Sequence, residues 1–313
     1  MRVLVLDNFA DVYAGHLRRQ FSGLTVHAAR KISEIDADLA AVDVLVAFGI
    51  AINDDLLAKM TGLKWVQSLA TGTDHFTNSP AWRKEVVLTS ARGIHGAPMR
   101  ETVALLMLSL ARNMRRIMRD QLNAHWDRGS PWMLLEGKTA VLVGVGVSTS
   151  AIAHLLKAFG MRVIGLSNAP REEPGFDEVR SRKDMLATVA EAHFLVNVLP
   201  GGPANANAIG EAVFAALPEH AFFINVGRGE TVDEAALLKA LQDKKIAGAG
   251  LDVFASAPLA KDSPFWQLEN VVITPHIAGF FSEYEDYVMP ILLDNMRAFL
   301  AGDGDAMRNI VAV

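Results

Sequence analysis

The stretch Ala140-Val141-Leu142-Val143-Gly144-Val145-Gly146-Val147-Ser148-Thr149 decides the fold. An apolar run typical of a buried strand meets a glycine turn, and a helix-like segment, 151–159, follows. In a dinucleotide-binding fingerprint the first glycine makes the tight turn, the second lets the backbone approach a pyrophosphate, and the third allows close helix packing. Gly144 and Gly146 fill the first two positions, whereas Thr149 stands in the third. A lone degenerate motif is weak evidence, so the interpretation depends on what surrounds it.

Strand-like runs alternate with helix-like segments on both sides of this turn. The runs lie at 3–6, 42–48, 64–69, 86–89, 140–143, 162–166, 194–199, 222–226, 249–254 and 271–274. The helix-like segments include 11–21, 54–60 with Asn53 as N-cap, 151–159, 234–242 and a last one at 283–300. This alternation predicts parallel sheets covered by helices on both faces, an α/β fold with doubly wound sheets.

The composition limits the number of domains and the kinds of partner. A length of 313 residues suggests two domains, and 51% hydrophobic residues supply two buried cores. A net charge of -5 gives no basic footprint for nucleic acid. The chain has no cysteine, which excludes disulfides and thiolate metal sites and fits a cytoplasmic protein. The longest apolar stretch, 103–111, is too short to cross a bilayer. We therefore expect no metal, no nucleic acid and no membrane as partners.

A long helix is expected from Pro98, because proline suits a first helical turn and apolar residues then recur at helical spacing. The tract 112–119 carries four arginines. A basic patch is one interpretation, and a solvated helix face is the favoured one.

Two chemically suited side chains follow apolar runs near the C-terminus. Arg228 lies in Asn225-Val226-Gly227-Arg228-Gly229 after the run 222–224, and His276 ends Thr274-Pro275-His276 after 271–273. Open α/β sheets bind ligands in the crevice beyond the carboxyl ends of their strands. A permanent cation and a group that titrates near neutrality are therefore expected to face one crevice.

The end of the second strand bears on the choice of dinucleotide. An NAD site usually has an acidic residue there for the ribose hydroxyls. This chain instead has Ser167-Asn168-Ala169-Pro170-Arg171, so nothing there repels a 2′-phosphate, and Arg171 offers a partner for one. Glu172 and Glu173 follow at once and weigh against this interpretation. NADP is favoured, and NAD stays open.

The ordered motifs carry a family resemblance. They are Gly137-Lys138-Thr139, Gly144-Val145-Gly146, Leu199-Pro200, NVGRGETVDEAALL at 225–238, GAGLDVF at 248–254 and NVVITPHIAG at 270–279. With them the chain resembles the D-isomer-specific 2-hydroxyacid dehydrogenases over nearly its whole length. The resemblance implies a flavodoxin-like substrate domain (1–96 plus 281–313) into which a Rossmann cofactor domain (97–280) is inserted. It also implies a homodimer held by the cofactor domains, with the helix after Pro98 in the interface.

The resemblance assigns roles to individual residues. Arg228 is similar to the arginine that pairs with the substrate carboxylate and polarises the C2 carbonyl, and His276 to the acid/base. Thr71 and Gly72 resemble the loop whose backbone N–H groups hold that carboxylate, and Asp252 resembles the residue that holds the nicotinamide carboxamide. A strand-end carboxylate satisfied by backbone is the alternative for Asp252. The other residues expected along the cofactor are Gly144, Gly146, Val147, Ser148, Ser167, Asn168, Arg171, Leu199, Pro200, Val226, Gly227, Ala278 and Gly279.

The sequence alone leaves two points open. Arg92 and His95, just before the long helix, fit either a position facing the crevice or a solvated hinge. More important, the family has a catalytic glutamate directly before a proline, where this chain has Ala257-Pro258. A carboxylate beside the histidine orients the ring and raises its pKa, and a methyl group does neither.

The missing glutamate leaves three outcomes. His276 works unaided, another group such as Ser256 or Glu283 replaces the glutamate, or the protein only binds its cofactor. We expect an NAD(P)H-dependent reductase that converts a small 2-oxo acid, such as glyoxylate or hydroxypyruvate, into the D-2-hydroxy acid. The rival is a dinucleotide-binding sensor or interaction protein of the same fold.

Overall fold

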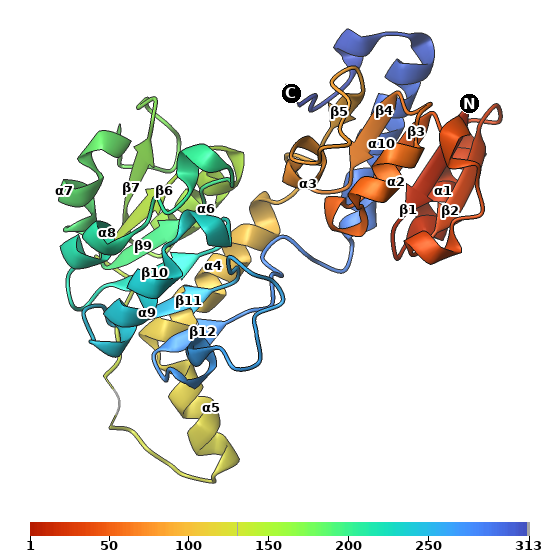
Figure 1. The fold of residues 1–313 in the computed structure, drawn as a ribbon. Helices are drawn as coiled ribbons and strands as arrows, with labels where there is room; N and C mark the ends of the chain where they lie inside the picture. Colours follow the sequence, from red (N-terminus) through yellow and green to blue (C-terminus); the bar gives the residue numbers. More distant parts are fainter. Residues whose placement is uncertain (130, 312–313) are drawn as a thin grey trace. The chain divides into compact units, whose positions relative to one another are not determined.

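The chain divides into two α/β units. The computed structural model describes residues 1–129 and 131–311, and contacts group Met1–Ile94 with Phe281–Val313 as unit 1 and His95–Phe280 as unit 2 (Figure 1). Residues 312 and 313, at the end of the range expected for the substrate domain, lie outside the described residues. The chain passes from unit 1 to unit 2 between residues 94 and 95, two residues before the boundary expected between 96 and 97. It returns to unit 1 between residues 280 and 281.

Unit 1 is built on a five-stranded parallel sheet in the order β2-β1-β3-β4-β5. Its strands are β1 (Arg2–Leu6), β2 (Thr25–Ala29), β3 (Val44–Ala47), β4 (Trp65–Ser68) and β5 (Val87–Thr89). This strand order is that of flavodoxin-like sheets. The predicted doubly wound α/β fold is therefore confirmed for this unit.

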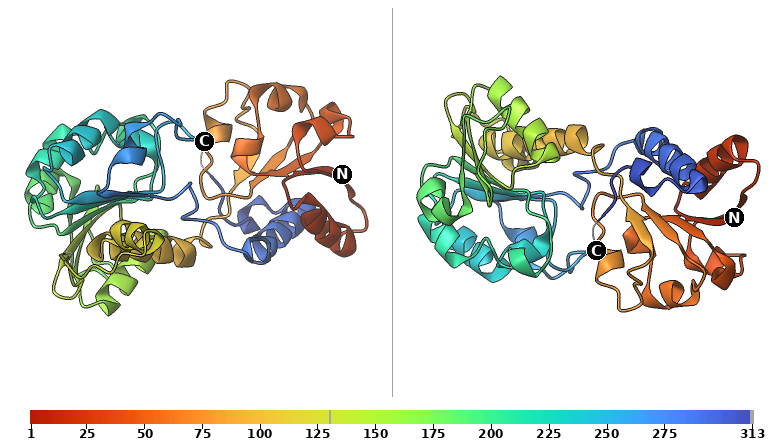
Figure 2. Two further views of the ribbon diagram at one scale, coloured as in Figure 1. Left: turned by 90° about the horizontal axis from the view of Figure 1, so that it is seen from below. Right: turned by 90° about the horizontal axis from the view of Figure 1, so that it is seen from above.

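Helices cover both faces of the unit 1 sheet. One face, with Val3 and Val5, packs on α1 (Ala10–Gln20) and α10 (Tyr284–Ala301), which lie side by side in Figure 2. The opposite face, with Leu4 and Leu6, packs on α2 (Asp54–Lys59) and α3 (Asp74–Thr77). Burial on both faces explains why these strands are continuous apolar runs rather than alternating ones. Asn53 caps α2 as predicted, its side chain accepting from the Leu56 amide at 2.9 Å.

Unit 2 contains a seven-stranded parallel sheet in the order β12-β11-β10-β9-β6-β7-β8. The strands are β6 (Thr139–Val143), β7 (Arg162–Ser167), β8 (Glu178–Ser181), β9 (Phe194–Asn197), β10 (Phe222–Asn225), β11 (Gly248–Leu251) and β12 (Val271–Ile273). Counted from β6, this is the Rossmann order with one more strand at the edge. The strand order changes direction between β6 and β9, which are parallel neighbours, and such a switch point is where these sheets bind ligands.

The unit 2 sheet also lies between two helical layers (Figure 2). On one face α4 (Gly96–Ala111) and α6 (Val147–Ala158) pack against Leu142, Phe194 and Ile224. On the other face lie α7 (Met185–Val189), α8 (Glu211–Ala216) and α9 (Glu234–Gln242). Gly250 in β11 allows the close approach of α4, since a Cβ there would lie 2.9 Å from Leu106 Cβ.

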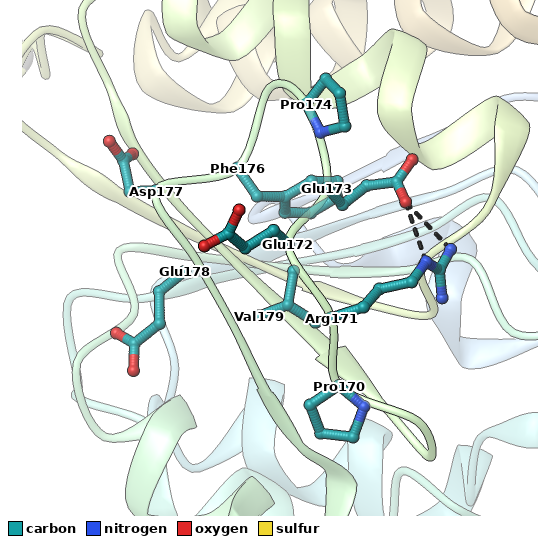
Figure 3. A pocket seen from close by; sticks show the side chains of 9 residues that line it. All are labelled: Pro170, Arg171, Glu172, Glu173, Pro174, Phe176, Asp177, Glu178 and Val179. Atoms are coloured by element: carbon teal, nitrogen blue, oxygen red, sulfur yellow. Dashed lines mark hydrogen bonds and ion pairs between the residues drawn. The ribbon is translucent and has the colours of Figure 1, made fainter.

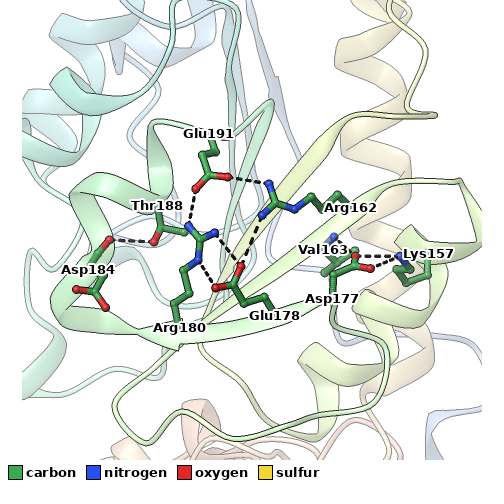
Figure 4. A network of polar contacts seen from close by, with 9 residues as sticks. All are labelled: Lys157, Arg162, Val163, Asp177, Glu178, Arg180, Asp184, Thr188 and Glu191. Carbon is green, nitrogen blue, oxygen red and sulfur yellow. Dashed lines mark hydrogen bonds and ion pairs between the residues drawn. The ribbon is translucent and has the colours of Figure 1, made fainter.

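Two edge strands, β2 and β8, were missed in the sequence. In β8 the pattern is polar, because the strand sits at the sheet edge and is stabilised by side-chain charges rather than by burial. Arg180 pairs with Glu178 and Glu191, and Arg162 bridges to the same two carboxylates (Figure 4). These contacts hold the pKa of both glutamates below the usual range. Hydrophobic periodicity does not detect such a strand.

The helix expected from Pro98 is interrupted. α4 ends at Ala111, Asn113 takes a left-handed conformation (φ 49), and α5 (Met114–Leu122) continues away from the sheet (Figure 1). The favoured interpretation of the arginine tract as a solvated helix face is wrong for Arg115. Its guanidinium donates to the carbonyl oxygens of Trp266 and Val271, each at 2.9 Å, so it fastens α5 to the segment before β12.

Candidate active site

The register of the unit 2 sheet brings the ends of its strands into one row. Val143 of β6 aligns with Asn197 of β9, which aligns with Asn225 of β10, and the row continues through Leu251 and Ile273. The residues that follow this row therefore share the carboxyl edge of the sheet. The candidate side chains of unit 2 either follow one of these strands or lie beside a residue that does.

The glycine turn fits a dinucleotide pyrophosphate. Gly144 has φ +102, a left-handed conformation that L side chains rarely adopt, and its Cβ position lies 3.5 Å from Val198 O. Gly146 caps the N-terminus of α6, and an added Cβ would find open space there. The 12-residue helix α6 begins here, and the partial positive charge of its first N–H groups favours an anion. Thr149, in the third glycine position, is buried against the sheet side of α6.

A buried pair of asparagines holds the strand ends on which the next residues depend. Asn197 Nδ2 donates to Asn225 Oδ1 at 3.0 Å and to Thr231 Oγ1 at 2.7 Å. Asn225 Oδ1 also accepts from the Gly227 amide at 3.2 Å. Sequence reasoning missed Asn197, since an amide at a strand end has no distinctive local pattern. The network fixes the turn that leads to Arg228.

Close backbone packing fixes Arg228 itself. A Cβ at Gly227 would lie 2.7 Å from Leu199 O, and one at Gly229 would overlap the carbonyl group of Phe254. Both glycines are therefore required for the β10 turn to fit between its neighbours. Arg228 is half-buried, and its Nη1 donates to Gly227 O at 3.1 Å. The predicted residues Leu199 and Gly227 thus lie against each other beside the arginine.

Asp252 fastens the turn that carries His276. The Asp252 side chain is 1% exposed and accepts from Thr274 Oγ1 (2.6 Å) and from the amides of Ile277 (2.9 Å) and Ala278 (3.0 Å). The His276 amide donates to Asp252 O at 2.9 Å, and His276 holds a φ of 57. A left-handed non-glycine residue persists only where its surroundings impose it. Two of these contacts come from backbone amides, as in the alternative considered for Asp252, and the third comes from a side-chain hydroxyl. Together they orient His276 through the backbone.

Replacing Asp252 by alanine is expected to lower the free energy of unfolding by about 3 kcal/mol, because buried donors lose their acceptor. Asp252→Asn keeps one oxygen and is expected to cost about 1 kcal/mol. Urea unfolding of the two variants measures this difference. Unchanged stability in the alanine variant, with only cofactor affinity reduced, would show that the carboxylate serves the nicotinamide and not the turn.

His95 is a further polar residue at this edge, and the sequence left its position open between crevice and hinge. It precedes α4, is 9% exposed, and its Cδ2 lies 3.0 Å from the Cβ position of Gly279. Burial and then the positive charge of Arg228 lower the pKa of His95 to about 4. The interpretation as a solvated hinge residue is therefore wrong, and a neutral imidazole lies beside the segment that follows His276.

His95 makes a specific prediction for acid stability. Its folded pKa lies below the unfolded value of about 6.5, so the unfolded chain binds more protons between these two pH values. The free energy of unfolding is expected to fall as the pH drops from about 6.5 to 4, by about 3 kcal/mol at most from this residue. His95→Gln removes that contribution, and denaturant unfolding across this range measures the difference. Equal pH slopes for both proteins would contradict the assignment.

The two residues expected to hold a substrate carboxylate by backbone lie in unit 1. Thr71 and Gly72 follow β4 in the loop that leads to α3. Ser68 shapes this loop, its hydroxyl accepting from the Ala70 amide at 3.2 Å and donating to Ala70 O at 3.1 Å. The structure thus places Thr71 and Gly72 at the end of a strand of the flavodoxin-like sheet.

The loop that contains Ala257 is exposed. The Ala255 amide donates to Glu234 Oε1 at 2.6 Å, which ties the start of the loop to α9. Ser256, one of the two groups considered as a replacement for the family glutamate, belongs to this unit 2 loop, whereas Glu283 belongs to unit 1. The family glutamate is thus replaced by a methyl group at an exposed position.

The fold and this edge define a class: an α/β protein with a Rossmann domain suited to a nicotinamide dinucleotide. A family model described as "D-isomer specific 2-hydroxyacid dehydrogenase, NAD binding domain" matches residues 104–278. The chain therefore belongs to the D-isomer-specific 2-hydroxyacid dehydrogenase family and is an oxidoreductase.

Relatives and solved structures agree with this assignment. Glyoxylate/hydroxypyruvate reductase B from Klebsiella pneumoniae is 31% identical, over 96% of this chain and 95% of the relative. A family protein from Aeromonas salmonicida has a similar structure, with a TM-score of 0.89 and 31% identity, covering 99% of this chain and 98% of the other. The structure of an NADPH-dependent glyoxylate/hydroxypyruvate reductase from Sinorhizobium meliloti, in complex with NADP and sulfate, is also similar. Its TM-score is 0.84 at 28% identity, and the match covers 99% of this chain and 98% of the other.

The described residues contain neither a metal cluster nor a membrane-spanning helix. Over 1–129 and 131–311, no group of three or more His, Cys, Asp or Glu side chains is arranged to hold a metal ion. Nor does any helix within those ranges combine the length and apolarity needed to span a bilayer.

Proposed function

We propose that the protein reduces a small 2-oxo acid of the glyoxylate/hydroxypyruvate class to the D-2-hydroxy acid, with NAD(P)H as reductant. One observation carries this proposal. Arg228, Asp252 and His276 follow three neighbouring strands, β10, β11 and β12, at the sheet edge that also bears the glycine turn. The names of the Klebsiella and Sinorhizobium relatives support the substrate class.

Arg228 binds and polarises the substrate in this proposal. A guanidinium stays charged at any working pH and its planar fork grips a carboxylate through two parallel hydrogen bonds. The backbone of Thr71 and Gly72 supplies further donors to the same carboxylate. Developing negative charge on the carbonyl oxygen is stabilised most by donors that are already in place, and the packing of Gly227 and Gly229 keeps Arg228 in place.

His276 gives a proton to the carbonyl oxygen in this proposal and takes it back in the reverse reaction. Imidazole titrates near neutrality, so it serves both directions. A nicotinamide cofactor bound at the glycine turn supplies the hydride. The Asp252 hydrogen bonds on both sides of His276 provide backbone orientation, which compensates in part for the absent glutamate at Ala257.

We assign NADP as the favoured cofactor and NAD as the alternative. The end of β7 carries Ser167 and Asn168 where an acidic residue would repel a 2′-phosphate. The Sinorhizobium relative was solved with NADP. The remaining cofactor contacts we propose come from the glycine turn and from the other strand ends, namely Val147, Ser148, Leu199, Pro200, Val226, Asp252, Ala278 and Gly279.

A substrate comparison tests this function. Hydroxypyruvate and glycolaldehyde offer the same hydroxymethyl carbonyl, but only hydroxypyruvate has the carboxylate that Arg228 is proposed to bind. NADPH oxidation is expected with hydroxypyruvate and not with glycolaldehyde, and the product is expected to be D-glycerate on a chiral column. Equal rates with the two compounds, or an L product, would contradict the proposal.

The second candidate function is a dinucleotide-binding sensor or interaction protein that has lost turnover. Ala257, which removes the family carboxylate, is the observation in its favour. Calorimetry with NADPH distinguishes the two functions when it is combined with a panel of 2-oxo acids. Saturable binding together with turnover excludes the sensor, and saturable binding without turnover favours it.

We also propose that the partner at α4 and α5 is a second copy of this chain. Large apolar side chains stand exposed along these helices and just beyond them: Leu105, Leu108, Met114, Met118, Leu122 and Trp126. Several large exposed apolar side chains on neighbouring helices favour an interface. Light scattering is expected to give a dimer, and Leu122→Glu, at a side chain 87% exposed, is expected to shift it toward monomer. A wild-type monomer at high concentration would contradict this.

A further inference from the structure

A loop after β7 forms a hollow at the end of the cofactor domain where adenosine binds in Rossmann sheets. It measures about 880 Å³ and is shown in Figure 3. The lining residues that matter here are Arg171, Glu172, Glu173, Phe176 and Asp177. The loop therefore contains both the arginine proposed for the 2′-phosphate and the acidic residues that weigh against it.

One of those acidic residues is bonded to the arginine. Arg171 Nε and Nη2 each lie 3.0 Å from Glu173 Oε2. The other oxygen of Glu173 accepts from Ser150 Oγ at 2.7 Å, and Ser150 Oγ lies 3.1 Å from Gly146 O in the glycine turn. The carboxylate thus bridges Arg171 to the first turn of α6. The Ser150 hydrogen bond and then Arg171 hold the pKa of Glu173 below its usual range, so it is ionised at neutral pH.

The rest of the loop is packed onto unit 2, which fixes the position of Glu173. Gly175 has φ +88, and a Cβ there would lie 2.8 Å from His154 Nδ1 on α6. The ring of Phe176 covers Gly165 of β7, whose Cβ position lies 2.9 Å from Phe176 Cε1. Asp177 accepts from Lys157 Nζ at 2.6 Å and from the Val163 amide at 2.8 Å (Figure 4).

We propose that Glu173 tunes nucleotide selectivity by holding Arg171 and placing a negative charge beside the proposed site of the 2′-phosphate, so that the preference for NADPH over NADH is smaller than Arg171 alone would give. The inference rests on the proposed binding of a dinucleotide at the glycine turn. The sequence shows no acid directly after β7, yet the fold brings Glu173 to Arg171 and to the first turn of α6. A 2′-phosphate has to share the guanidinium with Glu173 and stand near its charge, whereas a ribose hydroxyl does neither.

The size of the effect follows from exposure. The Arg171 and Glu173 side chains are 48% and 20% exposed, so solvent screens the pair and only part of its Coulomb energy counts. Removal of the carboxylate charge is expected to tighten NADPH binding about fivefold, in line with the modest energies of partly exposed charge pairs. Because the effect is electrostatic, it is also expected to shrink at high salt.

Dissociation constants for NADPH and NADH, measured by calorimetry on wild type, Glu173→Gln and Glu172→Gln, test the proposal. Glu172 is the matched control, since the same charge is removed one residue away and Figure 3 shows its carboxylate turned away from Arg171. Glu173→Gln is expected to tighten NADPH about fivefold and to change NADH less than twofold. Glu172→Gln is expected to change the ratio of the two constants by less than twofold, because it leaves the Arg171 pair intact.

The double variant Arg171→Ala/Glu173→Gln identifies the route of the effect. It is expected to lose the NADPH gain of Glu173→Gln, since no guanidinium is left to release. Weaker NADPH binding in Glu173→Gln would overturn the proposal and show that the carboxylate orients Arg171 for the phosphate. Equal changes for both nucleotides would overturn it as well. If wild type binds neither nucleotide, the proposed function fails together with it, whereas binding without a selectivity change refutes Glu173 alone.

Discussion

Replacing Arg228 with glutamine is expected to lower kcat/KM for hydroxypyruvate by about 10³-fold, while the dissociation constant of NADPH changes little. A buried charge pair that loses one partner typically costs 2–5 kcal/mol, and each ~1.4 kcal/mol corresponds to a factor of ten. The guanidinium is the group proposed both to bind the carboxylate and to polarise the carbonyl. Loss of it therefore affects the transition state as well as ground-state binding. Steady-state kinetics, together with calorimetry for NADPH, measure the two effects separately.

Arg228→Lys is the matched control for charge. The ammonium keeps the positive charge but lacks the planar fork, so it is expected to recover only part of the loss. The close packing of Gly227 and Gly229 on either side does not depend on the side chain at 228, so both variants are expected to unfold near the wild-type midpoint. If Arg228→Gln retained wild-type kcat/KM, Arg228 would not be the substrate-binding group.

Replacing His276 with alanine is expected to reduce kcat by about 10³-fold, the usual range for loss of a general acid. The left-handed φ of 57 at this residue makes asparagine the better-tolerated substitute, since Asn adopts that region more readily than most residues. His276→Asn thus separates loss of the imidazole from strain in the turn. Both variants are expected to be inactive, with the alanine variant also less stable. Single-turnover rates and urea unfolding measure the two effects, and activity above a tenth of wild type in either variant would contradict the role.

Ala257→Glu restores the carboxylate that the family carries and shifts the pH profile. An acid that donates a proton is active in its protonated form, so kcat/KM for reduction falls as the pH rises through the pKa of the imidazole. A nearby carboxylate favours the imidazolium and raises that pKa. The fall of kcat/KM is therefore expected at a higher pH in Ala257→Glu than in wild type. At pH 8 the kcat of the variant is expected to be severalfold higher. A fall at the same pH as in wild type would mean that position 257 has no influence on His276.

The strand ends were predictable because their signal is local. Apolar runs that end in NVGRG or TPH identify both the strand and the side chain that follows it, and parallel strands necessarily present their ends at one edge. Edge strand β8 lacked that signal, since Arg180 and its two glutamates replace the buried residues on which hydrophobic periodicity depends. The order of the strands in each sheet is a property of long-range pairing that spacing along the chain does not contain.

The contacts inside the site were less predictable for the same physical reason. The sequence shows that Asp252 ends a strand, but not that its carboxylate accepts from groups on both sides of His276. It shows that Glu173 is near Arg171 along the chain, but not that Ser150 on the preceding helix α6 holds the pair. The environment of His95 depends on the packing of Gly279, which is far away in sequence. Each of these depends on how separate segments meet.

One assay decides whether this chain catalyses 2-oxo acid reduction with an alanine in place of the family glutamate. Oxidation of NADPH and NADH by the wild-type protein is followed with glyoxylate and hydroxypyruvate from pH 5 to 9. We expect turnover that declines as the pH rises, because His276 acts as an acid without a neighbouring carboxylate from position 257. Saturable binding of either nucleotide without turnover at any pH would contradict it and identify the chain as a binding protein.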